Sequence, residues 1–446
     1  MSRTPPMSVA VIGGGAIGSA AAWQLAARGH RVVLVEQFGP GHGRGASHGS
    51  SRIFRYSYPS ALYIELARRA GRLWRRLERL HGQRFYARTG SVDHGDPAAV
   101  QRLARSLHQA GIEHSVLTPG EAELQWPGLR FDGMVLHHPD SGRLHADQAV
   151  AALQRCAQVE GAEIRFHTSA TGVRVSPSGV RVLSASGSIR VDQVVVAAGA
   201  WTCDILESLP TLSRSLPALV TTQEQPAHFA PRQTPVGWPS FLHHPGGQYL
   251  GPAVYGLAAP DGVKVGEHGT GPRVTPQHRD FGPIRTVCGG CSVQRSDGCR
   301  GRSDPGRGHH LPVHVHPRPG HFVIDRRGPI TVAAGFSGHG FKFAPAIGEL
   351  IAGLVAEQGR SHPLPAWTSC LRTGFGRTAL TLPIAPPRHP IPGAFHVHRF
   401  EHFRKPAAGV EHPCPADPRE PADRRGRPHR HHPAGAHPAR RSPARR

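Results

Sequence analysis

Three glycines and a glutamate near the start of the chain have the spacing of a dinucleotide-binding site. They are Gly13, Gly15, Gly18 and Glu36, in the pattern G-x-G-x-x-G followed by an acid. Gly13 would permit a tight turn, Gly15 a close approach of the backbone to a pyrophosphate, and Gly18 close packing of a helix on its strand. A carboxylate such as Glu36 accepts hydrogen bonds from ribose hydroxyls. The spacing therefore predicts that this region binds a dinucleotide.

Two apolar runs and the Ala-rich segment between them would position these residues. Val9–Ile12 and Arg31–Val35 are predicted to be buried parallel strands, and the helix between them ends by about Arg28, before Gly29. An alternative is a signal peptide, since Arg3 precedes this apolar stretch. The closely spaced glycines and the second strand ending in an acid argue against it.

Three later segments could bring further groups to the nucleotide. A Gly/Ser-rich loop carries Arg52 and Arg55, two cations three residues apart. A Val-rich run ends in small residues that include Gly199, which suits a backbone lying close to a cofactor. Gly338 and Gly340 lie in a glycine-rich segment before a predicted helix, where unpaired N–H groups and the positive end of the helix dipole favour anions.

The composition limits the classes of protein to which this chain could belong. Of its 446 residues, 38% are apolar, 54 are Gly and 43 are Pro, and the net charge is +23. Long apolar-periodic segments exclude a collagen-like or wholly disordered chain, and no apolar run reaches the roughly 18 residues of a membrane span. Seven Cys are too few for a disulfide scaffold. We therefore expect a protein of a reducing compartment, the cytoplasm.

Two stretches differ from the rest of the chain in amino-acid composition. Residues 283–320 are rich in Cys, Gly, Arg and His with almost no periodicity, and residues 367–446 end in clusters of Arg, His and Pro. Such a tail buries too little apolar area to offset its ordering entropy, so we expect it to be disordered. It lacks interleaved aromatic residues, so any contact with nucleic acid would be nonspecific.

Several motifs together resemble the monomeric sarcosine oxidase and N-methyl-L-tryptophan oxidase family of FAD-dependent amine oxidases, within the D-amino-acid oxidase-like superfamily. Besides the glycine pattern, they are residues 47–55 (SHGSSRIFR), 139–142 (PDSG), 194–201 (VVVAAGAW), 264–268 (KVGEH), 321–325 (HFVID) and 335–343 (GFSGHGFKF). The motifs span about residues 8–268 and 321–358.

The resemblance implies an α/β fold, a two-layer flavoprotein. A discontinuous Rossmann-like domain would bind FAD, and a substrate domain with an antiparallel sheet would cover the flavin. The FAD-binding domain would take residues 8–90, 149–218 and 321–366, and the substrate domain 91–148 and 219–320. Within the latter we expect 283–320 to be disordered or frame-altered. Residues 367–446 would form the disordered basic tail.

The resemblance also implies which residues hold FAD. The ADP half would contact Gly13, Gly15, Gly18 and Glu36. The isoalloxazine ring would lie beside His48 and Arg52, which are candidate catalytic residues. The later glycine-rich segments would contact the cofactor through Gly199, Gly338, His339 and Gly340.

Five further residues would bind the substrate or assist the reaction. Arg55 and Lys342 would hold the substrate carboxylate by charge-assisted hydrogen bonds. Tyr255 and His268 would line the amine side, although a purely structural role stays open for both. Lys264 would sit over the flavin, where its charge favours reduction of O₂. An N-methyl or secondary amine would be oxidised by the flavin to an imine that hydrolyses, and O₂ would become H₂O₂.

One departure from the family concerns the cysteine that attaches FAD covalently, just before the H-F-V-I-D motif. No cysteine lies between His309 and Gly320, and the nearest is Cys299. We therefore predict non-covalent FAD. The codons of His310–Pro319, read one base later, could spell the family's segment, which suggests a frameshift.

Other interpretations stay open. The chain could be a catalytically dead relative whose basic tail governs its contacts, or a D-amino-acid or glycine oxidase on the same fold. Cys288 and Cys291 form a C-x-x-C pair, but their surroundings fit no metal-ligand pattern, so we expect no metal site. We expect a monomer whose partners are a small amino acid and O₂, without specific nucleic acid and without a membrane.

Overall fold

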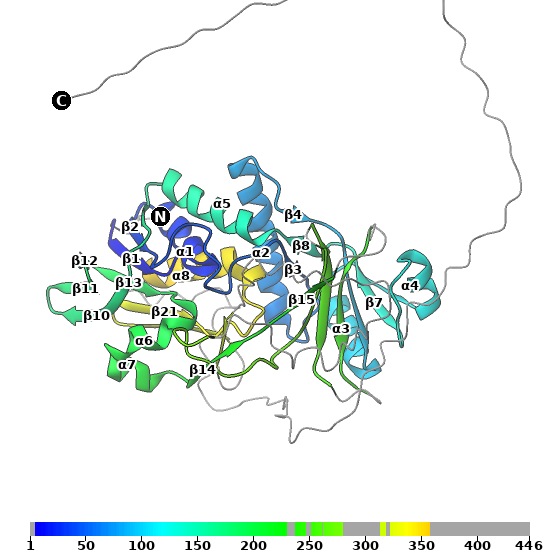
Figure 1. Cartoon of the computed structure of the whole chain (residues 1–446). Helices are drawn as coiled ribbons and strands as arrows, with labels where there is room; N and C mark the ends of the chain where they lie inside the picture. Colours follow the sequence, from blue (N-terminus) through cyan, green and yellow to red (C-terminus); the bar gives the residue numbers. More distant parts are fainter. Residues whose placement is uncertain are drawn as a thin grey trace, which may run out of the picture. The chain divides into compact units, whose positions relative to one another are not determined.

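Two large β-sheets organise the described part of the chain. The structure is a computed structural model that describes residues 5–229, 237–246, 251–260, 262–279, 313–317 and 322–356, all within the unit Met1–Arg399. The basic tail predicted over 367–446 and most of 283–320 lie outside these residues, as does about half of the segment 310–319 on which the frameshift hypothesis rests. In Figure 1 one sheet occupies the left of the molecule, around β1 and β13, and the other the right, around β7 and β15.

The first sheet has six strands and is parallel except at one edge. Its order is β20 (Val323–Arg327), β21 (Ile330–Ala334), β13 (Gln193–Val196), β1 (Ser8–Ile12), β2 (Arg31–Val35) and β9 (Glu163–Arg165). The edge strand β20 runs antiparallel to β21. The two strands predicted from the N-terminal apolar runs are therefore confirmed, and they lie beside strands from much later segments.

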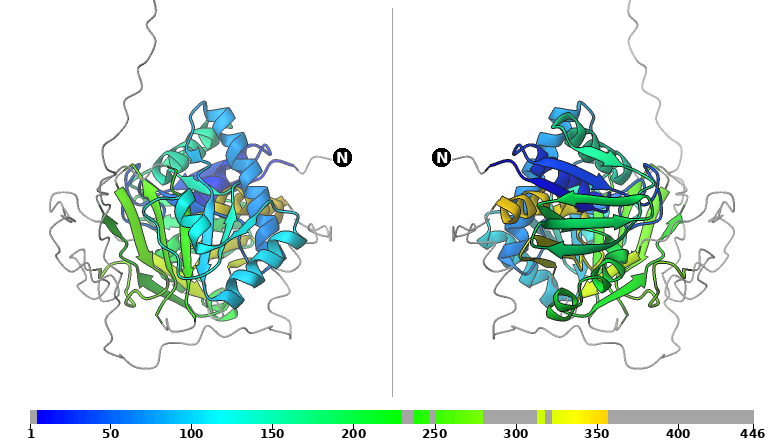
Figure 2. Two further views of the ribbon diagram at one scale, coloured as in Figure 1. Left: turned by 90° about the vertical axis from the view of Figure 1, so that its right-hand side faces the viewer. Right: turned by 90° about the vertical axis from the view of Figure 1, so that its left-hand side faces the viewer.

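Helices cover one face of this sheet, and a smaller sheet covers the other. The helices are α1 (Ala16–Ala26), α2 (Ala61–His81), α5 (Ala146–Val159) and α8 (Ala344–Ala356), whose apolar residues share one core. A Cβ at Gly348 of α8 would lie 2.5 Å from the backbone of Ala20, so only glycine lets α8 approach α1 this closely. Figure 2 shows these two segments, dark blue and yellow, next to each other.

On the opposite face, the three-stranded antiparallel sheet shares a second core with two short helices. Its strands are β10 (Ala170–Ser176), β11 (Gly179–Ser184) and β12 (Gly187–Val191), and the helices are α6 (Thr202–Glu207) and α7 (Pro210–Ser215).

The second large sheet has seven strands. Its order is β15 (Ala227–Phe229), β18 (Gly262–Glu267), β17 (Val254–Ala259), β16 (Ser240–His244), β5 (Ser91–Gly95), β7 (Val135–His138) and β6 (Ser115–Leu117). The pair β5–β16 is parallel, and the others are antiparallel. The helices α3 (Pro97–Gln109) and α4 (Pro119–Gln125) pack on its β5–β7–β6 side.

A three-stranded sheet joins segments that the sequence assigned to different domains. β8 (Gly142–Leu144), which falls in the predicted substrate segment, pairs with β3 (Arg52–Phe54) and β4 (Tyr86–Ala87). The mixed α/β fold class is confirmed, and the domain boundaries stay a prediction.

One correction concerns the stretch predicted to be disordered. Val313–Pro317 forms strand β19, which pairs antiparallel with β14 (Leu219–Gln223). The disorder predicted for these five residues is wrong, because their backbone groups can pair with those of a neighbouring strand whatever the composition around them. The alternative, that the segment is frame-altered, stays a prediction. Among the described helices none is both long and apolar enough to span a membrane.

Candidate functional site

One cavity brings together nearly all the residues that the sequence singled out. Its volume is about 780 Å³, within the roughly 300–1,000 Å³ usual for small-molecule and cofactor sites. Of the predicted residues its wall contains Gly13, Gly15, Glu36, His48, Arg52, Arg55, Gly199, Tyr255, Lys264, His268, Gly338, His339, Gly340 and Lys342. Gly18 is not part of the wall, and it supports the site through packing.

The glycine loop at the end of β1 has a backbone that only glycine adopts readily. Gly13 has a φ of +104°, and a Cβ there would lie 2.5 Å from the carbonyl oxygen of Ala197. A Cβ at Gly18 would clash with the carbonyl oxygen of Gly13. Gly18 therefore lets α1 begin close against the loop, which leaves the first N–H groups of the helix at the cavity.

The carboxylate of Glu36 lies at the end of β2 and is bound on several sides. It accepts hydrogen bonds from the N–H of Gly14 at 2.7 Å and of Phe38 at 3.0 Å, and His42 lies 3.4 Å away. Burial alone would raise the pKa of Glu36, but His42 and the two N–H groups together lower it below its ordinary value. Glu36 is therefore an ionised acceptor in the cavity wall.

The Gly/Ser-rich loop folds over the start of α1. Ser47 accepts a hydrogen bond at 3.0 Å from the N–H of Ala16, the first residue of the helix. His48 donates through Nδ1 to the carbonyl oxygen of Gly45 at 2.7 Å. Arg52 donates to carbonyl oxygens of this loop at 2.7 and 2.8 Å, and its guanidinium lies over the ring of Phe341. The loop therefore holds a histidine and an arginine in the cavity wall.

Two cations meet at another part of the wall, around Tyr58. The Nζ of Lys342 donates to the Tyr58 hydroxyl at 3.0 Å and to the carbonyl oxygen of His339 at 2.8 Å. The guanidinium carbon of Arg55 lies 4.4 Å from the centre of the Tyr58 ring. Burial, and then the charge of Arg55, lower the pKa of Lys342 well below its ordinary value. Tyr58 was not found from the sequence.

A buried aspartate behind Arg55 was also missed. Asp93 is 0% exposed and lies 3.9 Å from the guanidinium. Its carboxylate accepts hydrogen bonds from Nε2 of His244 at 2.8 Å and from Nε2 of His138 at 3.4 Å. Burial would raise the pKa of Asp93, but the two histidines and Arg55 hold it far below its usual range. No strand was predicted from the sequence at Ser91–Gly95, so nothing local indicated a buried carboxylate there.

The sheet side of the cavity carries the remaining predicted residues. Tyr255 lies on β17, Lys264 on β18 and His268 just after it, and the Lys264 side chain is almost wholly buried. Burial raises the pKa of Tyr255 to about 12, and that of Tyr58 to about 12. Both phenols are therefore protonated at neutral pH.

No cysteine of the described residues lines the cavity. Cys156 on α5 and Cys203 on α6 are free thiols, and neither belongs to the wall.

Comparison with known proteins places the chain among flavoenzymes. The family model DAO, described as FAD dependent oxidoreductase, matches residues 8–354. A monomeric sarcosine oxidase from Streptomyces avermitilis is 34% identical over 387 residues, which cover 81% of this chain and 96% of the relative. An N-methyl-L-tryptophan oxidase from Yersinia pestis is 27% identical over 365 residues, covering 77% and 93%.

Solved structures share the fold. NikD, described as an unusual amino acid oxidase essential for nikkomycin biosynthesis, has a TM-score of 0.65 at 24% identity and covers 80% of this chain and 96% of its own. A glycine oxidase from Geobacillus kaustophilus has a TM-score of 0.62 at 20% identity, covering 81% and 98%. At such identities the likeness concerns the fold.

Proposed function

The chain belongs to the family of FAD-dependent oxidoreductases, and we propose that it oxidises the C–N bond of an N-methyl or secondary amino acid with O₂ to an imine and H₂O₂. Its relatives are sarcosine oxidases, and the chain is accordingly an FAD-dependent amine oxidase. The observation that carries the finer proposal is the pair of cations in the wall of the glycine-loop cavity, Arg55 and Lys342.

The residues present fit FAD. Gly13 and Gly15 bring the backbone and the start of α1 to the cavity, where N–H groups can bind a diphosphate. The ionised Glu36 would accept hydrogen bonds from ribose hydroxyls, and His48 and Arg52 would flank the ring system. When bound, FAD supplies the two-electron acceptor that the reaction requires and returns the electrons to O₂.

Arg55 and Lys342 would bind the substrate through its carboxylate. Both side chains are largely buried, so a charge-assisted hydrogen bond to either is stronger than it would be in water. Asp93 is a positioning residue, because it holds Arg55 from behind while His138 and His244 satisfy its other lone pairs. The substrate would thus be bound by its carboxylate, and its amine would point toward the sheet side of the cavity.

The residues on the sheet side of the cavity would contact the amine and O₂. Tyr255 and His268 would contact the amine. Because the phenol of Tyr255 is protonated, it would donate or accept a hydrogen bond and would not act as a phenolate base. The Lys264 ammonium would stabilise the negative charge that develops on O₂ as it is reduced.

We propose that FAD is held without a covalent bond, since neither described cysteine lines the cavity and the family's attachment cysteine has no counterpart before His321. Acid precipitation should release the flavin into the supernatant. Flavin that stays with the precipitated protein would contradict this.

Binding of acetate, a carboxylate with no amine to oxidise, should weaken as the pH rises. Lys342 is charged below its lowered pKa and neutral above it, so one of the two cations is lost at a pH where an ordinary lysine, of pKa about 10.4, stays charged. The inhibition constant of acetate should rise above that pKa and level off at the value set by Arg55 alone. In Lys342→Met this rise should be absent, and acetate binding that stays constant up to about pH 10 in the wild type would contradict the assignment.

A peroxide-coupled screen tests the proposed function. Secondary and N-methyl amino acids should give H₂O₂, and their primary counterparts should give much less. Preference for glycine or D-amino acids would favour the alternative oxidases, and a flavin-free protein inactive on all of them would favour a catalytically dead relative.

We also propose that the chain acts as a monomer, in keeping with the name of the relatives, monomeric sarcosine oxidase. We place it in the cytoplasm because its few Cys suit a reducing compartment. Size-exclusion chromatography with light scattering should give the mass of one chain.

A further inference from the structure

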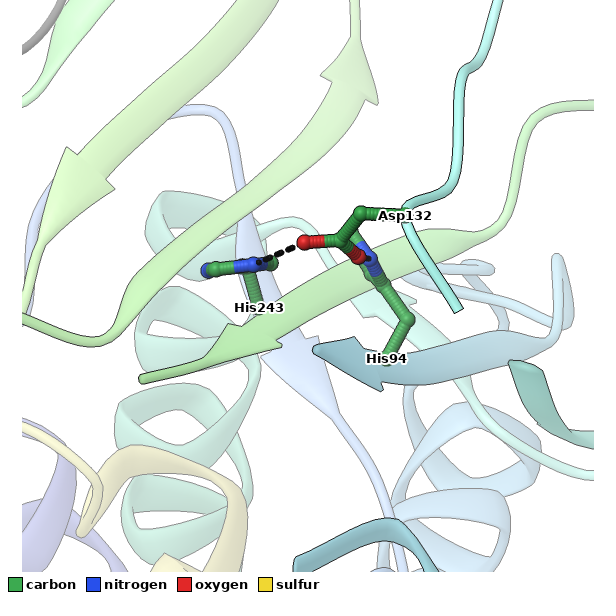
Figure 3. A group of neighbouring side chains, drawn as sticks. All are labelled: His94, Asp132 and His243. Carbon is green, nitrogen blue, oxygen red and sulfur yellow. Dashed lines mark hydrogen bonds and ion pairs between the residues drawn. The ribbon is translucent and has the colours of Figure 1, made fainter. Parts of the chain in front are cut away.

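Two histidines and an aspartate form a cluster on the seven-stranded sheet, apart from the cavity. They are His94 on β5, His243 on β16 and Asp132, which precedes β7 (Figure 3). Each offers one ligand atom, and the three atoms lie within 4.8 Å of one another. We propose that His94, Asp132 and His243 bind a divalent transition metal ion, with Zn²⁺ the ion that fits them best.

The strand register brings the two imidazoles together. β5 and β16 pair in parallel with His94 directly opposite His243, so both side chains stand on the same face of the sheet. Their ring centroids are 4.9 Å apart. The neighbouring residues Asp93 and His244 take part in the network behind Arg55, which lies on the other face. This alternation separates the cluster from the FAD cavity, whose wall contains none of its three residues.

The carboxylate of Asp132 contacts both histidines. Its Oδ1 lies 3.1 Å from Nδ1 of His94, and its Oδ2 lies 2.9 Å from Nε2 of His243, as the dashed lines in Figure 3 show. The two ring nitrogens therefore point at the same carboxylate. An ion placed among them would replace these two hydrogen bonds by three metal–ligand bonds of roughly 2.0–2.2 Å, which needs only small side-chain rotations.

The surroundings suit a metal ligand set. His94 is buried, and the ring of Phe131 lies edge-on at 5.1 Å, which restricts the imidazole to one orientation. The side chain of Asp132 is 58% exposed, which leaves water access for the fourth position of a tetrahedral site. Two imidazoles and one carboxylate are ligands that Zn²⁺ and similar ions prefer, whereas Mg²⁺ and Ca²⁺ prefer oxygen ligands alone.

Local spacing could not indicate this site, since its ligands come from three separated segments. In the fold they link β5 to β16, the only parallel pair among the described strands of this sheet, and fasten the segment before β7 across both. A bound ion would therefore join the two sequence-distant parts of the sheet and stabilise it, because it binds the folded state only.

Zinc binding by the purified full-length chain, after dialysis against a chelator, tests the proposal. The chain has 32 His and 7 Cys that can bind zinc elsewhere, so the comparison is between variants. In equilibrium dialysis with metal analysis, the wild type should bind one tight equivalent more than Asp132→Asn and His243→Gln. Each of these should lose at least tenfold in affinity at that site. His108→Gln, an exposed histidine on α3, is the matched control and should bind like the wild type.

A second readout is thermal stability. Zn²⁺ should raise the Tm of the wild type and of His108→Gln more than that of Asp132→Asn, and Mg²⁺ should raise none. Asp132→Asn changes no volume at an exposed position, so circular dichroism should show an unchanged fold. If both ligand variants bind as much zinc as the wild type and gain the same Tm, the cluster is a hydrogen-bonded group only and the proposal is wrong. Neither readout requires FAD or turnover.

Discussion

Replacing Arg55 by Met should raise the KM for the amino acid substrate by roughly 30- to 4,000-fold. Removing one partner of a buried, hydrogen-bonded charge pair costs about 2–5 kcal/mol of binding, and a tenfold change corresponds to about 1.4 kcal/mol. In this chain the loss has a second part, because Asp93 is wholly buried and keeps its charge after Arg55 is gone. Without the guanidinium between them, Asp93 would repel the carboxylate of the substrate.

Steady-state kinetics and the flavin spectrum together measure this effect. Arg174→Met, at an exposed arginine on β10, is the matched control and should leave the KM unchanged. Arg55→Met should retain its FAD, since the guanidinium contacts Ser57 and Tyr58 rather than the glycine loop. A KM within threefold of the wild-type value would remove Arg55 from the substrate site.

Replacing Lys264 by Met should slow the reaction with O₂ by about 10²–10³-fold and leave reduction by the substrate nearly unchanged. A preorganised charge acts where charge develops in the transition state, and removing such a group typically has this cost. Lys264 is almost wholly buried in the cavity wall on β18, so water cannot replace its charge. The substrate carboxylate would lie at Arg55 and Lys342, which the variant keeps.

Stopped-flow measurements separate the two half-reactions. Lys264→Arg keeps the charge and should recover much of the rate with O₂. Equal slowing of both half-reactions in Lys264→Met would indicate a general distortion of the cavity, and an unchanged rate with O₂ would contradict the assignment.

The N-terminal unit could be predicted because its determinants are local. Apolar runs of four or five residues, the glycine pattern and an Ala-rich segment identify β1, α1 and β2 within about 30 residues, and the structure has Ser8–Ile12, Ala16–Ala26 and Arg31–Val35. The motifs then led to the family, which the match over residues 8–354 confirms. Most residues predicted for the site line one cavity, although their roles stay predictions.

The parts that were missed depend on contacts between distant segments. Tyr58 meets Lys342 across 284 residues, and His244 meets Asp93 across 151, so no local spacing reports either contact. The strand Val313–Pro317 forms because β14 offers it hydrogen bonds, which its composition does not reveal. Gly18 lies outside the cavity wall and packs α1 against the turn, which is the role that its place in the glycine pattern predicts; its contact with the cofactor stays a prediction.

A crystal structure of the chain with FAD and acetate would test most directly whether the glycine loop and the two cations serve one bound cofactor and its substrate. The diphosphate should lie against the backbone N–H groups at the start of α1, and the acetate carboxylate between Arg55 and Lys342, next to the flavin ring. A diphosphate bound away from Gly13 and Gly15, or acetate bound away from both cations, would contradict the assignment of this cavity.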